Sequence, residues 1–293
     1  MTVDTLRAAP APAQRRLVAN TRWATLRGVY MIWRRDLIRF WRDRARVLGT
    51  LVQPLLFLLI LGTGLSSALR GAGGGFGGGL DYQVFMYPGI IGMAVLFSSI
   101  FSGMSIIWDR EFGFLKEVLV APIDRSAVAI GKILGGATQA MFQGVILLVL
   151  APFFGVKLTP LAVLEAIALI FCIAFALSGV GVAIASRMRS MMGFQFVLNF
   201  LVQPAFFLSG AMFPVTGLPG WMTALTRLDP LTYGVDPIRR IVLDAAGVPA
   251  PVLDRLSLAL SNQVVPIALE AAVVLGFGLL MMGIAVFNFR KQE

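Results

Sequence analysis

The sequence predicts an all-α membrane protein with about six transmembrane helices. Of its 293 residues, 58% are hydrophobic and only 14% are charged, and the mean hydropathy is +0.83. A soluble domain of this composition would expose apolar surface to water, whereas a bilayer accepts it. Six apolar runs are long enough to cross about 30 Å of hydrocarbon as helices. They lie at residues 47–69, 84–107, 128–154, 161–185, 191–213 and 264–287.

The basic residues predict the orientation of these spans. We assign 19 of the 25 Lys and Arg to one side of the membrane, in the segments before residue 47, within 108–132, and near residues 187–189 and 290–291. The positive-inside rule makes that side the cytoplasm, so both termini are expected inside a bacterial plasma (inner) membrane. Contact with anionic lipid accounts for the net charge of +10. No soluble domain presents a basic face with interleaved aromatic residues, so we expect no nucleic-acid partner.

Composition also limits the chemistry of the chain. Histidine is absent, which excludes His-based metal sites and catalytic dyads or triads. The single cysteine, Cys172, lies in an apolar run, so no disulfide framework is expected. A phosphate-binding G-x-x-x-x-G-K-[ST] motif is absent, because Gly131-Lys132 is followed by Ile133. We therefore expect no catalytic residues, metal or cofactor in this chain, and no ATP hydrolysis by it alone.

The N-terminal region divides into two parts. Residues 1–21 lack an apolar core and are expected to be a disordered cytoplasmic tail. Residues 22–46 are expected to form an amphipathic interfacial helix in the headgroup plane. This helix either only anchors the chain to the membrane or also touches a partner protein. Its apolar face consists of residues spaced by three and four: Leu26, Tyr30, Trp33, Leu37 and Phe40.

Residues 47–293 are expected to form one six-span domain, in which the first and fifth spans repeat the tetrapeptide Leu-Val-Gln-Pro. The repeat places Gln53-Pro54 and Gln203-Pro204 at membrane depth. A proline in a span frees a backbone carbonyl, and a neighbouring Gln favours a protein or cavity face over lipid. The four residues are therefore candidates for a pathway or dimer interface, or simply for helix packing. Phe97 and Phe101 of the second span are further candidates for an apolar pathway, although such residues more often face lipid or the core.

Two features are expected on the outer side. Residues 214–262 form a long external segment in which two short amphipathic helices are predicted, one around Trp221 to Leu228 and one around Ile238 to Val242. Glu270 is the deepest acid, about two turns into the last span. An acid at that depth is a functional candidate, for instance as a proton site. Without a plausible basic partner, it can equally be protonated or hydrated.

Residues 108–132, which we call the island, form a charged segment between the second and third spans. Phe112, Leu115, Val118 and Leu119 recur at helical spacing and predict an amphipathic helix, which Pro122 ends. A short helix held between two spans can act as a lever for a docking protein. The alternative is an ordinary connecting loop.

The island also carries the motif R-E-x-G-x-L-x-E-x-x-x-x-P-x-x-R-x-x-x-x-x-G-K, at residues 110–132. It resembles the cytoplasmic coupling helix of ABC type-2 transporter permeases. A second set of matches follows in the same order: L-S-G-x-x-F-P at 208–214, L-P-x-W at 218–221 and P-L-T-Y-x-x-D-x-x-R at 230–239. The resemblance covers nearly the whole chain and is nearest to the drug-resistance and nodulation-factor export branch.

This resemblance implies one half of an ATP-driven exporter. The partners would be two copies of a separate ABC ATPase, which binds ATP and Mg, a second permease copy in a homodimer, and the lipid bilayer. The implied cargo is a hydrophobic or amphipathic molecule, with a polysaccharide or lipooligosaccharide as the alternative. An ion-coupled secondary transporter or a non-transporting scaffold are the remaining alternatives. The implied ATPase-coupling residues are Arg110, Glu111, Gly113, Leu115, Lys116, Glu117, Pro122 and Arg125.

Overall fold

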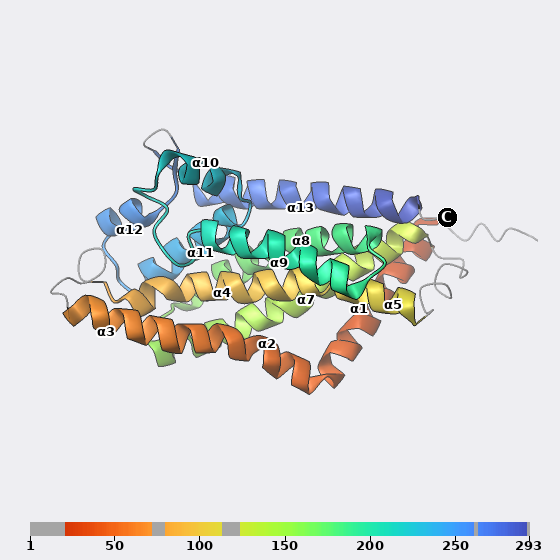
Figure 1. Ribbon diagram of the computed structural model, residues 1–293, viewed down its shortest axis with the longest axis horizontal. Helices are drawn as coiled ribbons and strands as arrows, with labels where there is room; N and C mark the ends of the chain where they lie inside the picture. Colours follow the sequence, from red (N-terminus) through yellow and green to blue (C-terminus); the bar gives the residue numbers. More distant parts are fainter. Residues whose placement is uncertain (1–20, 72–79, 113–123, 261–262, 292–293) are drawn as a thin grey trace, which may run out of the picture.

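The described part of the chain is almost entirely helical (Figure 1). A computed structural model describes residues 21–71, 80–112, 124–260 and 263–291. Two short strands, β1 (Ala259–Leu260) and β2 (Gln263–Val264), pair antiparallel with Ala259 opposite Val264. The helices in chain order are α1 (Thr21–Arg42), α2 (Arg44–Phe57), α3 (Thr63–Gly71), α4 (Tyr82–Phe101), α5 (Met104–Glu111), α7 (Arg125–Leu150), α8 (Pro160–Arg187), α9 (Met191–Leu208), α10 (Gly220–Leu228), α11 (Thr232–Ala245), α12 (Ala250–Leu256) and α13 (Ile267–Arg290).

Six helical stretches are long and apolar enough to cross a membrane, which confirms the six-span, all-α prediction. The fifth stretch ends at Leu208, earlier than expected, because Gly210 adopts a left-handed conformation with φ of +75° that ends the helix. The stretches are Val47–Gly71, Tyr82–Glu111, Arg125–Phe154, Pro160–Arg187, Met191–Leu208 and Ile267–Arg290.

Capping side chains fix the starts of three of these helices. The Asp124 side chain accepts a hydrogen bond from the Ser126 backbone N–H at 2.9 Å and begins α7. Thr159 begins α8 by accepting from the Ala162 N–H at 3.2 Å, and Ser190 begins α9 in the same manner. Each cap satisfies an N–H group that has no partner within its own helix.

The first span is irregular. Pro54 lies inside α2, and a π-helical turn at Leu58–Gly62 joins α2 to α3. A proline lacks the backbone N–H and crowds the carbonyl one turn earlier, so the regular helix is weakened here. α1 meets α2 at Asp43, where the chain bends sharply (Figure 1).

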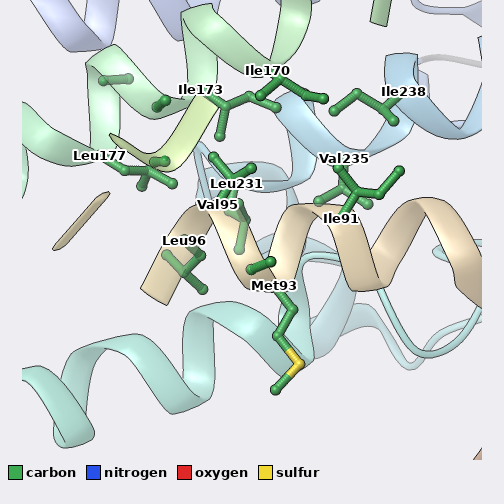
Figure 2. Packing of buried hydrophobic residues seen from close by; sticks show 14 of the residues in the cluster. Ile91, Met93, Val95, Leu96, Ile170, Ile173, Leu177, Leu231, Val235 and Ile238 are labelled. Atoms are coloured by element: carbon green, nitrogen blue, oxygen red, sulfur yellow. The ribbon is translucent and has the colours of Figure 1, made fainter. Parts of the chain in front are cut away.

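The core lies where α4, α8 and α11 meet. Figure 2 shows Ile91 and Val95 of α4 facing Ile170 and Ile173 of α8, with Val235 of α11 beside them. All five side chains are buried. α7 also packs on both α4 and α8, so α4 is covered on several sides. This explains why the second span is the most buried of the six.

Backbone contacts at glycines bring the central helices unusually close. A Cβ atom added at Gly103, between α4 and α5, would lie 2.5 Å from the carbonyl oxygen of Gly181 in α8. A Cβ added at Gly181 would likewise lie 2.5 Å from the Ile100 carbonyl oxygen. Small residues are the usual means by which membrane helices approach each other closely. The contact fixes α8 against the junction of α4 and α5.

Both helices predicted between the fifth and last spans form. Around Trp221 a short exposed helix, α10, forms as expected. The second helix, α11, buries its apolar side chains Ile238, Ile241 and Val242 in the main core, which the sequence did not predict. α11 packs on α4, α8 and α13. The chain therefore turns back into the bundle, and α12 and the small hairpin complete the segment.

The predicted apolar face of α1 is only partly covered by protein. Leu26 and Tyr30 are exposed, whereas Ile32, Asp36 and Phe40 are buried. Trp33, also on the predicted face, donates through Nε1 to the hydroxyl of Thr138 in α7 at 3.0 Å. The buried face of α1 therefore contains a carboxylate. Residues 1–20 lie outside the described residues.

Candidate functional site

Five charged side chains meet at the end of the bundle where the island begins and ends, which we call the island end. Lys132 of α7 lies at their centre and is almost fully buried. Its Nζ lies 2.6 Å from Oδ2 of Asp109 in α5 and 3.0 Å from Oδ2 of Asp36 in α1. It also donates to the hydroxyl of Ser105 at 3.0 Å. One ammonium group thus joins three helices.

Two arginines of α1 complete this set, which we call the charged cluster: Arg35, Asp36, Arg39, Asp109 and Lys132. Arg35 Nη2 lies 2.8 Å from Asp109 Oδ2 and 2.9 Å from Asp36 Oδ1, and Arg39 Nη1 lies 3.4 Å from Asp109 Oδ1. Burial alone would lower the pKa of Arg35, but the two carboxylates outweigh it and raise the pKa, so the guanidinium stays charged. Three cations around two carboxylates leave the cluster with a formal charge of +1.

Glycines of α7 allow this approach of α1. A Cβ at Gly131 would lie 2.9 Å from Cβ of Ile32 and 3.0 Å from the Val29 carbonyl oxygen. A Cβ at Gly135 would lie 3.3 Å from Cβ of Asp36. The structure explains the Gly-Lys pair that ends the island motif. Gly131 lets α1 approach α7 closely, and Lys132 pairs with the carboxylate of Asp36 in α1.

Both ends of the island are held by hydrogen bonds. Arg110 donates to the Ser186 carbonyl oxygen at 3.0 Å and to that of Met188, both at the end of α8. Arg125 donates to the carbonyl oxygen of Arg290 at 3.4 Å, at the end of α13. Glu111 is exposed. Gly113, Leu115, Lys116, Glu117 and Pro122 lie outside the described residues, so the predicted amphipathic helix stays a prediction.

Sequence reasoning missed the partners of Lys132. One signal was available, because Asp36 is the only acidic residue in residues 21–42, a segment rich in arginine. A single carboxylate on the otherwise apolar helix face of Ile32 and Phe40 indicates a cation nearby. Asp109 gave no comparable signal, since it stands among other charges at the edge of the island.

Four of the predicted pathway residues line one cavity of about 460 Å³ near the bend between α1 and α2. Gln53 and Pro54 come from α2, and Phe97 and Phe101 come from α4. The other lining residues come from α1, the α1–α2 junction, α2, α4, α5 and α7: Phe40, Asp43, Gly49, Thr50, Ala94, Ser98, Met104, Trp108, Gln139 and Gln143. The cavity is apolar over most of its wall and carries amide and hydroxyl groups.

Gln203 and Pro204 are placed elsewhere. Both lie on α9 and are exposed. α9 and α2 each pack on α4, and most of the surface of each is uncovered in the single chain (Figure 1). The structure therefore does not bring the two Gln-Pro pairs into one cavity of this chain.

A second group of charges lies at the opposite end of the bundle, which we call the far end. Arg240 of α11 pairs with Glu270 of α13, and its Nε lies 3.2 Å from Asp236 Oδ2. The fully buried Arg239 donates to the Gly210 carbonyl oxygen, and its guanidinium lies 4.7 Å from the Phe85 ring centroid. The L-S-G and D-x-x-R parts of the second motif set thus meet in the fold.

This far-end pairing corrects the prediction for Glu270. The residue lies in the first turn of α13, not two turns into the span. The expectation that it lacks a basic partner is wrong, because Arg240 pairs with it. Sequence spacing does not reveal this pair, because Arg240 lies about thirty residues before Glu270, in the segment predicted to be external.

No group of three or more Cys, Asp or Glu side chains that could hold a metal ion occurs within residues 21–71, 80–112, 124–260 and 263–291. The charged cluster contains two carboxylates, and both are already paired with cations. The charged cluster is therefore an ion-pair network that holds α1, α5 and α7 together.

Comparisons with known proteins place the sequence in a family of membrane transporters. The family described as ABC-2 type transporter matches residues 27–243. Nodulation protein J of Rhizobium leguminosarum bv. trifolii is 29% identical over 72% of this chain and 80% of its own length. The putative transport permease ycf38 of Cyanophora paradoxa is 26% identical over 72% of each chain. Nodulation protein J of Azorhizobium caulinodans is 26% identical over 83% of this chain and 92% of its own.

Proposed function

This chain belongs to the ABC-2 type transporter family, and from that premise we propose that it is the membrane subunit of an ATP-driven exporter. It is a multi-pass transport subunit without catalytic residues of its own. We propose that two copies work with two copies of a separate ABC ATPase, which binds ATP and Mg. The island end faces the cytoplasm of a bacterial plasma membrane, which the concentration of Lys and Arg there supports.

The charged cluster is the observation that carries the proposal. The described chain leaves α5 at Phe112 and resumes before α7 at Asp124, and Asp109 and Lys132 tie these two helices together near both points. α1 joins the same cluster through Asp36. A force applied to the island therefore acts on α1, α5 and α7 as one unit. ATP-driven closure of the partner would move them together and change access across the membrane.

The cavity supports a hydrophobic or amphipathic cargo. Its wall combines aromatic and aliphatic side chains with a few amide and hydroxyl groups, which is the usual composition of a small-molecule site. The surfaces of α2 and α9 are largely uncovered in the single chain, as is that of α13. The polar pattern of the Gln-Pro pairs at membrane depth favours α2 and α9 as the surfaces that a second copy, related by two-fold symmetry, would cover. The Gln53-Pro54 and Gln203-Pro204 faces would then lie near that interface.

The test uses the complex of this chain with its partner ATPase in proteoliposomes. We compare the parent chain with the double variant Glu111→Ala, Gly113→Trp, which alters the predicted docking surface. Losing charge-assisted contacts there should weaken docking and reduce cargo-stimulated ATP hydrolysis by roughly tenfold. Glu165→Ala, an exposed position in α8, is the matched control.

Transport is measured in the same vesicles with a panel of hydrophobic drugs, lipids and lipooligosaccharides. ATP-dependent export by the parent and the control, with loss in the double variant, supports the proposal. Export driven by an ion gradient without ATP would contradict it. Full stimulation of ATP hydrolysis in the double variant would show that the island is only a connecting loop.

A further inference from the structure

The exposed face of α10 is apolar, whereas a polar residue of the same helix faces the protein. Trp221 and Leu228 are 67% and 79% exposed, and Leu225 lies between them on the same face and is also exposed. Thr226, on the opposite face, is only 1% exposed. A helix that borders water has the reverse arrangement. The apolar face of α10 therefore needs a cover other than water.

The neighbouring span places α10 at the edge of the membrane. α9 has 18 residues, and with a rise of about 1.5 Å per residue its length of about 27 Å is close to the thickness of the hydrocarbon. Its last residue, Leu208, therefore lies near the membrane boundary at the far end. α10 packs on α9 and lies at that end (Figure 1). Its apolar face is thus at the depth where acyl chains meet headgroups.

Arg227 lies at the edge of this apolar face and is exposed. Its Nη2 donates to the Ala259 carbonyl oxygen at 3.3 Å, and it forms no ion pair with any residue that the structure describes. Arginine at the border of an apolar surface keeps its stem on that surface and its guanidinium among polar headgroups. Tryptophan is likewise enriched at this depth. The chemistry of both residues matches a lipid interface.

We propose that α10 is an interfacial anchor, with Trp221, Leu225 and Leu228 among the acyl chains of the leaflet at the far end and Arg227 on a lipid phosphate. In the orientation proposed above, this is the outer leaflet. The other possible cover is a second copy of the chain. The face of α10 carries no amide, unlike the Gln-Pro faces proposed to meet between copies, and acyl chains need no hydrogen-bonding partner.

The anchor is joined to the segment between the fifth and last spans. The Tyr233 hydroxyl of α11 donates to the Arg227 carbonyl oxygen at 2.9 Å, and the guanidinium of the same arginine reaches Ala259 of β1. α11 is buried in the core. The leaflet therefore holds this segment on its membrane side, while the bundle holds it through α11.

The depth of α10 is measured with spin labels on the full-length chain in nanodiscs, without ATPase or cargo. In a Cys172→Ser background, labels are attached at Leu225→Cys and Leu228→Cys. Leu279→Cys, exposed in the middle of α13, is the reference for lipid, and Asp254→Cys, exposed in α12, is the reference for water. Oxygen concentrates in hydrocarbon, whereas nickel-EDDA stays in water, so collisions with the two reagents report the surroundings of each label.

Both α10 labels should collide with oxygen as the label at Leu279→Cys does and should lose most of the nickel-EDDA collisions seen at Asp254→Cys. Nickel-EDDA collisions as frequent as at Asp254→Cys would overturn the proposal, since the face would lie in water. Few collisions with either reagent would also overturn it, because a second copy would then cover the face. The result is independent of export, so failure of the proposed function would not change it.

The contribution of Arg227 is measured with a fluorophore at Leu228→Cys, also in the Cys172→Ser background. Quenching by brominated phosphatidylglycerol is compared with quenching by brominated phosphatidylcholine. The anionic lipid should bind beside α10 roughly three- to fivefold more tightly, and Arg227→Gln should abolish this preference. Arg255→Gln, exposed in α12, is the control and should retain it. A preference that survives Arg227→Gln, or that is absent from the chain with Arg227 intact, would refute the phosphate contact.

Discussion

Lys132 is a single cation shared by Asp36 and Asp109, and its removal would leave two buried carboxylates with fewer positive partners. We predict that Lys132→Met destabilises the chain by about 3–5 kcal/mol, the usual cost of breaking a buried ion pair from one side. The measurement is the thermal unfolding midpoint of the detergent-solubilised chain, followed by the reaction of Cys172 with a thiol dye.

Lys157→Met, at an exposed position, is the control and should leave the midpoint unchanged. A triple variant, Lys132→Met with Asp36→Asn and Asp109→Asn, removes the unpaired charges and should recover part of the loss. If Lys132→Met unfolds at the parent temperature, the cluster does not hold the three helices together.

A second prediction for a single residue concerns Asp229, at the start of the turn into α11. It is mostly buried, and its side chain accepts a hydrogen bond from the Leu231 N–H at 3.0 Å. Burial raises the pKa of Asp229 from 3.8 to about 7. Between these values the unfolded chain loses the proton while the folded chain keeps it, so stability falls as pH rises from about 4 to about 7 and then levels off.

Asp229→Asn keeps an acceptor for Leu231 and removes the titration. We expect the variant to unfold at a higher temperature than the parent at pH 8, by roughly 2–4 °C for each kcal/mol relieved. The difference should shrink as the pH is lowered toward 5. The exposed Asp254→Asn is the control. A difference between variant and parent that does not change with pH would contradict the assignment.

At the scale of elements, long apolar runs predicted all six spans, because hydrophobic length alone determines whether a helix can cross a bilayer. Sequence pattern also predicted the helix α11, but not its burial. Its sequence contains Asp236, Arg239 and Arg240, and such charges normally exclude a segment from the interior. The fold compensates them with one another, with Glu270 and with the ring of Phe85. These partners come from distant parts of the chain, so local pattern could not reveal them.

The close contact at Gly103 gives a prediction for the junction of α4, α5 and α8. Gly103→Ala would place a methyl group 2.5 Å from the carbonyl oxygen of Gly181, and a backbone atom cannot move aside as a side chain can. We expect a loss of about 1–3 kcal/mol in the free energy of unfolding. Gly276→Ala in α13, where nothing lies within 4 Å, should be neutral or slightly stabilising. Equal effects of the two substitutions would refute the contact.

For the whole molecule, the sequence predicted the membrane class and the position of the island, but not how the ends of the island are held. The repeated Gln-Pro pairs were the strongest intramembrane signal, and within this chain they lie apart: Gln53 lines the cavity and Gln203 is on the exposed surface of α9. Gln53 and Gln203 could come together only between two copies of the chain. The sequence of one chain does not determine how two copies pack.

Cross-linking between protomers tests that assembly. In a Cys172→Ser background, Gln53→Cys and Gln203→Cys should each give cross-linked dimers with a short bifunctional maleimide in native membranes. The physical reason is that each Gln places a polar amide on an uncovered helix surface at membrane depth, where a protein partner is preferred to lipid. Leu279→Cys on exposed α13 is the control and should remain monomeric. Dimers through Leu279→Cys with none through the two Gln positions would place the interface on α13.

The pairing of α11 with α13 has a consequence for how the chain is made. Arg240 is synthesised about thirty residues before Glu270, and Arg239 needs both Phe85 and the Gly210 carbonyl oxygen. Arg240 therefore reaches Glu270 only once the last span is present, and Asp236 of its own helix is its acidic partner until then. We expect a chain that stops before α13 to hold α11 less firmly against the bundle, so that added protease cleaves it faster than in the complete chain.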